Sequence, residues 1–206
     1  MKRGIERVLQ AGILLLPLAC WPDLAHPFST PKTWLLAVLA VCSLAALAVS
    51  HPPAGRRHEW IWLLWPAAIS VSALRAPSPG FDALLLAALP LPLAWALWRR
   101  AIDASSVLRA ILIGSALESA IVCLQYTGLD PLLAIGWHPE SFASSRMRMY
   151  GTLGNPDFAA AWLCATLPLY LGNRGILRVF AILQIAAVFA TGSRVALLAL
   201  PVGAIG

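Results

Sequence analysis

The chain of 206 residues is 60% hydrophobic and only 12% charged, with a mean hydropathy of +0.78. This composition lies far outside the range of soluble domains and excludes an ordinary water-soluble enzyme. The 15 Lys and Arg against 9 Asp and Glu give a net charge of +6, which we attribute to loops that flank membrane spans rather than to nucleic-acid binding. The four cysteines show no metal or redox spacing and are expected to be packing residues.

Apolar runs recur along the chain, and prolines punctuate most of the connections. They predict an all-α fold, a polytopic transmembrane helical bundle of about seven full spans plus a truncated eighth. The basic N-terminus resembles a signal peptide, but an uncleaved first helix is favoured because more spans follow. Residues 1–206 are expected to form a single integral membrane domain, with spans at 5–21, 34–50, 60–75, 83–98, 107–127, 157–173, 176–190 and from about 195.

The last apolar run is too short to cross a bilayer. From Val195 to Gly206 it would extend roughly 18 Å at about 1.5 Å per residue, against a hydrocarbon core of about 30 Å. We therefore expect the chain to be the N-terminal part of a longer protein.

Charge placement predicts the orientation. With the N-terminus inside, most cations fall on the cytoplasmic side, as the positive-inside rule requires. The cytoplasmic set is Lys2, Arg3, Arg7, Arg56, Arg57, Arg99, Arg100, Arg109, Arg174 and Arg178. The other side keeps Lys32, Arg75, Arg146, Arg148 and Arg194, three of which lie close to two glycine-bearing stretches.

The first stretch is residues 150–157, Tyr-Gly-Thr-Leu-Gly-Asn-Pro-Asp, which closes the longest connection, 128–156. Asn155 is predicted to be an N-cap, Pro156 the first helical residue and Asp157 a favourable acid in the first turn. Glycines 151 and 154 are expected to let backbone N–H groups face outward, and a helix N-terminus beside arginines is a ready anion site. A tight re-entry turn with arginines that reach lipid head groups explains the residues equally well.

The second stretch is Thr191-Gly192-Ser193-Arg194, a short outer turn that holds Arg194 close to the apolar boundary. Arginine suits bidentate phosphate binding, although an interfacial anchor is the alternative interpretation.

Glu118 lies in the middle of the predicted fifth span, one turn from Ser115 and two from Gln125. A carboxyl group there is costly and must pair or face water. It is a mechanistic residue, the partner of a cation, or a protonated acid. The histidines have no metal-ligand spacing, and His26 and His138 are expected to be loop residues.

Arg148-x-x-Gly-Thr-x-Gly-Asn-Pro, then an apolar helix pair, then Ser193-Arg194, resembles the O-antigen ligase and polymerase superfamily, which includes bacterial oligosaccharide transferases that act on proteins. Pro31-Lys32 and Gln125 are similar to family features too. The resemblance is specific over about 148–170 and 191–200. The chain departs from the family at Asp157, where Asn is common, and at Val195, where Gly is frequent.

The resemblance implies a multi-pass glycosyltransferase of the bacterial inner membrane with a cytoplasmic N-terminus. It would use no cofactor, metal or nucleotide sugar, and would contact membrane lipid but no nucleic acid. At the periplasmic face it would transfer an oligosaccharide from a polyprenyl diphosphate carrier to a glycan acceptor: lipid A-core, a growing glycan or a protein. The family's catalytic histidine would lie beyond Gly206, so this chain is expected to contain no catalytic residue, and to bind without turnover.

The resemblance also implies a site for the carrier's diphosphate. Arg148 and Arg194 would carry most of the binding, as cations that stabilise the leaving group. The remaining binding residues would be Arg146, Gly151, Thr152, Gly154, Asn155 and Ser193, with possible support from Lys32, Arg75, Glu118 and Gln125.

Two other functions fit the residues. In a secondary transporter or lipid-linked glycan flippase, Glu118 would be a coupling residue and the broken Gly151–Pro156 backbone a substrate site. That function predicts inverted repeats, which the sequence does not show. A non-catalytic assembly subunit is the third possibility.

Overall fold

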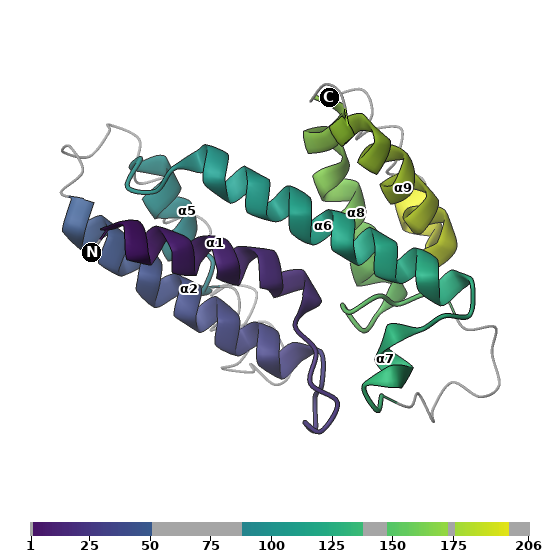
Figure 1. Ribbon diagram of the computed structural model, residues 1–206. Helices are drawn as coiled ribbons and strands as arrows, with labels where there is room; N and C mark the ends of the chain where they lie inside the picture. The colour runs from purple at the N-terminus through teal and green to yellow at the C-terminus, as the bar shows by residue number, and fades with distance from the viewer. Residues whose placement is uncertain (1, 51–87, 138–147, 173–175, 198–206) are drawn as a thin grey trace, which may run out of the picture. The chain divides into compact units, whose positions relative to one another are not determined.

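The computed structural model describes residues 2–50, 88–137, 148–172 and 176–197, and these ranges contain helices and no strand (Figure 1). In chain order the described helices are α1 (Lys2–Leu18), α2 (Ser29–Ser50), α5 (Leu91–Trp98), α6 (Ala104–Tyr126), α7 (Pro131–Ala134), α8 (Pro156–Leu171) and α9 (Ile176–Thr191).

The prediction of about seven full spans is wrong. Among the described residues only α2 and α6, with 22 and 23 residues, are long and apolar enough to cross a membrane. Helices α8 and α9 have 16 residues each, or roughly 24 Å, which falls short of a core of about 30 Å. Helix α1 begins with Lys2 and Arg3, and its apolar part starts only at Val8. Many of the apolar residues thus belong to helices that are too short to cross a membrane.

Association with a membrane is still favoured, because two of the described helices are apolar and long enough to span. The expected spans at 34–50 and 107–127 correspond to α2 and α6. Those at 60–75 and beyond 197 lie outside the described residues, as does part of the one at 83–98.

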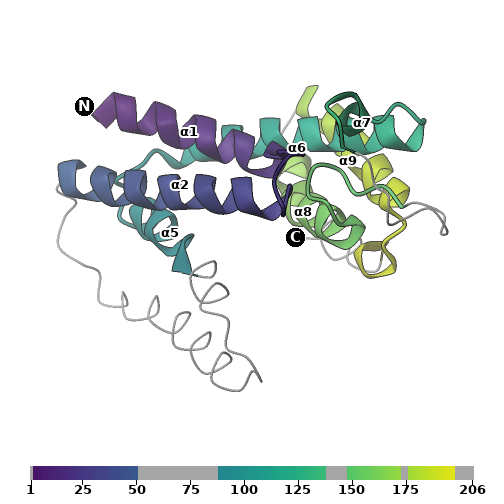
Figure 2. The same cartoon turned by 90° about the horizontal axis from the view of Figure 1, so that it is seen from below.

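The chain divides into two compact units, and the first comprises residues 1–13 and 33–107. Within it α1 and α2 run side by side in opposite directions (Figure 2). Gly12 allows this close approach, because a Cβ there would lie 2.8 Å from Leu39 Cδ2. Ser50 Oγ donates to the Ala101 carbonyl at 3.3 Å. The buried apolar residues of this unit include Leu9, Ile13, Leu39, Ala46, Ala96, Ile102 and Val107.

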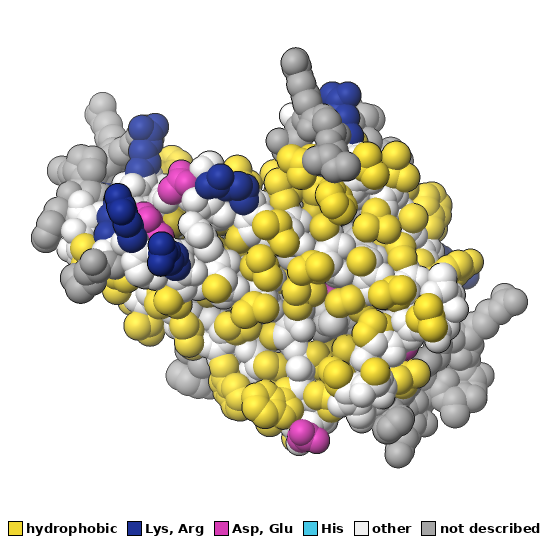
Figure 3. Space-filling view, in the orientation of Figure 1, with side chains coloured by type: hydrophobic (Ala, Val, Ile, Leu, Met, Phe, Trp, Pro, Cys, Tyr) yellow, Lys and Arg dark blue, Asp and Glu magenta, His cyan; other side chains and the backbone are white. Residues whose placement is uncertain are grey.

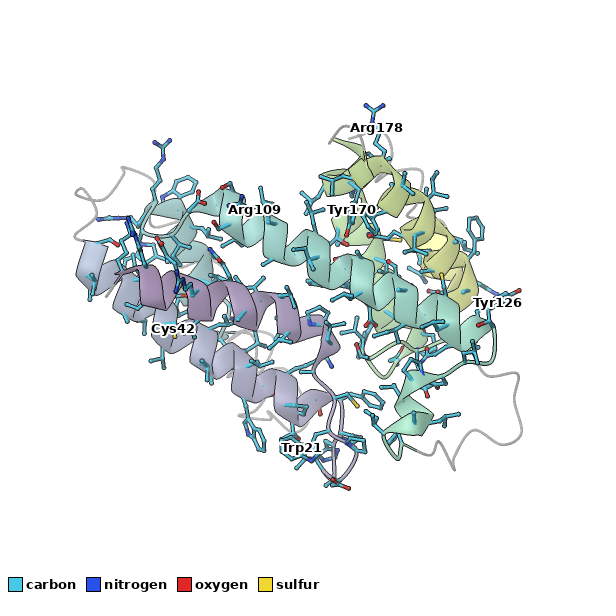
Figure 4. The ribbon with its side chains drawn as sticks, viewed as in Figure 1. Trp21, Cys42, Arg109, Tyr126, Tyr170 and Arg178 are labelled. Carbon is cyan, nitrogen blue, oxygen red and sulfur yellow. The ribbon has the colours of Figure 1, made fainter. Side chains whose placement is uncertain are left out.

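The second unit comprises residues 14–32 and 108–206, and its core lies among α6, α8 and α9. Helices α8 and α9 lie side by side (Figures 1 and 2). One core cluster gathers Val122, Leu163 and Val188 from the three helices. A second gathers Leu112, Leu167 and Tyr170, and the Tyr170 hydroxyl donates to the Leu112 carbonyl of α6 (Figure 4).

Apolar side chains remain exposed on these helices, and hydrophobic atoms dominate the face in Figure 3. On α9 the exposed residues Val179, Ile182 and Phe189 recur at helical spacing. Such a stripe is typical of a helix whose apolar face contacts lipid or another protein. Arg178, at the start of α9, extends away from the helix (Figure 4).

Candidate functional site

The N-terminus of α8 forms as the sequence predicts. Asn155 has extended backbone geometry and its side-chain oxygen accepts the N–H of Asp157 at 2.8 Å. Pro156 occupies the first helical position, where no N–H is needed, and Asp157 is the acid of the first turn. The predicted cap is therefore confirmed, and it fixes the direction in which the chain leaves the glycine-bearing turn.

The two glycine-bearing stretches come together at this helix end. Arg148 Nη2 lies 3.2 Å from Asp157 Oδ2. A Cβ on Gly192 would lie 3.5 Å from Arg148 Cδ, so the Arg148 side chain runs past the α9 end. Ser193 hydrogen-bonds the Asp157 carboxylate, and this bond, followed by Arg148, holds the pKa of Asp157 below its usual value. Residues far apart in sequence thus share one small polar surface.

This surface is open to solvent. The Arg148 and Asp157 side chains are 45% and 54% exposed, so their ion pair contributes little to folding stability. Arg194 is exposed as well and begins the short helical segment 194–197. Ser193 is buried, and its hydroxyl oxygen accepts the Ala196 N–H at 3.4 Å. The sequence-predicted Arg146 and Arg75 lie outside the described residues.

The backbone N–H groups of the turn are directed inward, so the expectation that they face outward is wrong at two positions. Gly151 N donates to Gln125 Oε1 at 2.9 Å, and Thr152 N donates to Glu118 Oε1 at 2.9 Å. Both residues are buried, and buried N–H groups require acceptors, which α6 supplies. A bound phosphate would therefore find these two donors already used.

Thr152 is the centre of a buried polar network. Its hydroxyl contacts Glu118 Oε2 and the Pro17 carbonyl, the latter at 2.7 Å. Its own carbonyl accepts from Lys32 Nζ at 2.7 Å, and Lys32 also donates to the Ala19 carbonyl. Glu118 is fully buried. Lys32, Glu118 and Gln125 therefore contact the turn itself, rather than the exposed surface around Arg148.

A second network, which the sequence interpretation missed, holds Tyr150, the residue before the turn, by hydrogen bonds around Asp130. Asp130 accepts the Tyr150 hydroxyl at 2.7 Å, the Gln125 amide at 3.1 Å and the Leu132 N–H at 2.9 Å. Burial, and then the bond to Asp130, raise the pKa of Tyr150 well above its usual value. The pair Asp130-Pro131 could have indicated this network, because it is an N-cap and first-position signature like Asn155-Pro156.

Phe28, in the segment before α2, was also missed. Its ring lies edge-on to Trp137, with centroids 4.9 Å apart, and to Tyr150 at 6.1 Å. It also covers Gly154, where a Cβ would lie 2.3 Å from Phe28 Cγ. No short-range pattern links Phe28 to a turn so far along the chain.

Within the described residues no three His, Cys, Asp or Glu side chains are grouped so that they could hold a metal ion. No protein-family model, curated protein or solved structure matches this chain. The site therefore rests on its own geometry: an exposed Arg148–Asp157 surface next to a turn in which Gly151 and Thr152 are buried and hydrogen-bonded.

Proposed function

We propose that this chain is a membrane protein of the O-antigen ligase and polymerase type, which binds the diphosphate of a polyprenyl-linked glycan. The site is the surface formed by Arg148, Asp157, Ser193 and Arg194. The observation that carries the proposal is the meeting of Arg148 with the end of α9, which gathers the two glycine-bearing stretches on one surface.

The guanidinium groups of this surface suit a diphosphate better than the single carboxylate of Asp157, with which Arg148 is paired. The exposed ion pair between Arg148 and Asp157 is worth little, so a ligand can displace Asp157 at small cost. A diphosphate offers two negatively charged groups, each able to accept two parallel hydrogen bonds from one guanidinium. Arg148 and Arg194 provide the cations, and Ser193, which bonds Asp157, precedes Arg194 in the chain.

In a transfer reaction the acceptor hydroxyl gives its proton to a general base outside the proposed site and attacks the anomeric carbon, while the bond from that carbon to the diphosphate breaks. Negative charge then develops on the departing polyprenyl diphosphate. Fixed cations lower the energy of that transition state, and this is the role proposed for Arg148 and Arg194. The acceptor hydroxyl belongs to lipid A-core, a growing glycan or a protein.

The proposal includes a location in the bacterial inner membrane, with the N-terminus inside and the Arg148 surface outside. Phe28 and Lys32, before and at the start of α2, contact the turn 151–154, whose Gly151 bonds Gln125 near the end of α6. If α2 and α6 both cross, these ends lie on one side of the membrane. The basic residues Lys2, Arg3 and Arg7 favour the opposite side for the N-terminus.

A transporter is less well supported. A coupling carboxyl must exchange its proton or ion with water during the cycle. Glu118 instead has no exposed surface, and both of its oxygens contact Thr152. This favours a supporting role for Glu118.

Binding of a fluorescent polyprenyl diphosphate to the purified chain in lipid nanodiscs tests the proposal. Arg148→Ala and Arg194→Ala should each weaken binding about tenfold to a hundredfold, since a hydrogen bond to a charged group is worth roughly 1.5–3 kcal/mol. Arg→Lys at either position should weaken it less, because the charge remains without the bidentate fork.

Arg178→Ala is the matched control, because Arg178 is an exposed arginine at the other end of α9. It should bind as the parent does. Unchanged binding by Arg148→Ala and Arg194→Ala, or an equal loss in Arg178→Ala, would contradict the proposed site.

A further inference from the structure

Every polar group of Thr152 is bonded to a residue that the proposed diphosphate site does not use. Glu118 Oε1 accepts the Thr152 N–H at 2.9 Å, and Glu118 Oε2 contacts the Thr152 hydroxyl. The Pro17 carbonyl accepts from the same hydroxyl at 2.7 Å. Lys32 Nζ donates to the Thr152 carbonyl at 2.7 Å. Thr152 is 2% exposed, so these bonds form away from water. One residue is therefore held from two sides by an acid and a base.

Lys32 and Glu118 have opposite charges when both are ionised, and the two side chains attract each other across Thr152. Glu118 belongs to α6 and is 0% exposed, and Lys32 belongs to the first turns of α2 and is half-buried. A buried charge without a partner is strongly unfavourable, whereas opposite charges around one peptide group offset each other. Removing either residue would leave the other uncompensated.

Thr152 lies in the chain between Arg148, a proposed binding cation, and Asp157, its ion-pair partner. Arg148 lies four residues before Thr152, and Asp157 follows Thr152 after the Asn155 cap. The side chains of Arg148 and Asp157 are exposed and have no tight packing of their own. Their position therefore depends on the backbone that carries them, and Thr152 is the most tightly bonded point of that backbone.

We propose that Lys32 and Glu118 are a charge-compensated pair of positioning residues that fix Thr152 and, through it, the segment from Arg148 to Asp157. The expected effect on diphosphate binding rests on the proposed function. The ordering of the turn by Lys32 and Glu118 can be measured without ligand, by hydrogen exchange. Lys32 is thereby assigned to the turn rather than to direct contact with the ligand.

A double-mutant cycle tests the pair. Hydrogen exchange of the peptide covering 148–157 is measured by mass spectrometry for the parent, Lys32→Met, Glu118→Gln and the double variant, in nanodiscs without ligand. Each single change should raise exchange at Thr152 and Leu153 by about tenfold or more, because it leaves a buried charge unpaired. The double variant should exchange more slowly than either single variant. Additive effects, or single variants that exchange like the parent, would overturn the proposal.

Thr152→Ser and Thr152→Val provide a milder pair, which decides the matter if a charge variant does not fold. Serine keeps the hydroxyl and should match the parent in exchange and in diphosphate binding. Valine has a similar shape without the hydroxyl, so exchange should rise and binding should fall about tenfold. Equal behaviour of the two variants would contradict the positioning role.

The same proteins are then tested for binding of the fluorescent polyprenyl diphosphate. If the parent binds and binding follows exchange across the cycle, the positioning role is supported. If the parent does not bind while the charges remain coupled in exchange, the proposed function fails and the pair around Thr152 stands. If the parent binds and the cycle is additive, the proposed function stands and the positioning pair fails.

Discussion

Glu118 occupies the space that a side chain on Gly151 would need. A Cβ at Gly151 would lie 1.9 Å from Glu118 Oε1, and the residue has a φ of +57°. Both facts require glycine: the backbone is in the left-handed region, and the carboxyl lies against the Cα. Gly151 therefore allows the Glu118 carboxyl to approach the backbone, where it accepts the adjacent Thr152 N–H.

Gly151→Ala should consequently destabilise the protein far more than alanine at a glycine of similar backbone conformation. Gly136 is the matched control, since its φ is +89° and a Cβ there would meet nothing within 4 Å. Both variants incur roughly 1–2 kcal/mol of left-handed strain, and Gly151→Ala adds about 1–3 kcal/mol of overpacking. Thermal unfolding in nanodiscs measures the difference. Equal melting temperatures would show that Glu118 can move aside freely.

Asp157→Asn should tighten diphosphate binding. The change removes a negative charge beside Arg148 and keeps a side chain that can bond Ser193, so binding should improve about two- to fivefold. Asp23→Asn removes the same charge from an exposed aspartate before α2 and should leave binding unchanged. Titration of the fluorescent diphosphate at moderate ionic strength is the measurement. Weaker binding by Asp157→Asn would mean that the carboxylate contributes to binding instead of being displaced by the ligand.

The orientation can be tested by cysteine accessibility in intact cells. After replacement of the native Cys20, Cys42, Cys123 and Cys164, single cysteines are introduced at Leu129, which is 67% exposed, and at Gly4, which is exposed. A membrane-impermeant maleimide should label position 129 directly and position 4 only after permeabilisation. The reverse pattern would reject the proposed orientation, and equal labelling of both positions would reject a crossing between them.

The start of α6 predicts a pH dependence in the acid range. Hydrogen bonds from Ser106, and then from Ser105, lower the pKa of Asp103 to about 2 from an ordinary value of 3.8. Because the folded-state pKa is depressed, the stabilisation by Asp103 is present above the ordinary value and is lost as the pH falls toward about 2. Carbon NMR of labelled aspartate should find this low pKa, and Ser106→Ala should raise it more than Ser105→Ala does. An unshifted resonance in the parent would disprove these hydrogen bonds to Asp103.

The sequence by itself determined the local structure around the candidate site. The order Asn155-Pro156-Asp157 was sufficient to predict the start of α8, because a cap is formed by residues two apart and needs no tertiary partner. The long apolar runs at α2 and α6 likewise predicted helices of spanning length. Hydropathy misled elsewhere, because apolar residues in α1, α8 and α9 do not lengthen helices that are limited to 17 or 16 residues.

Only the tertiary structure decided what the polar residues do. A mid-helix carboxyl signals that a partner must exist, but the residues that become its neighbours are set by helix packing. The structure selects Thr152 for Glu118, the carbonyls of Ala19 and Thr152 for Lys32, and Phe28 as the cover of Gly154. These contacts join residues that lie 34 or more positions apart, except for Lys32 with Ala19, so no short-range pattern could have paired them. They also turned the N–H groups of Gly151 and Thr152 inward, because a buried donor bonds the nearest acceptor that packing provides.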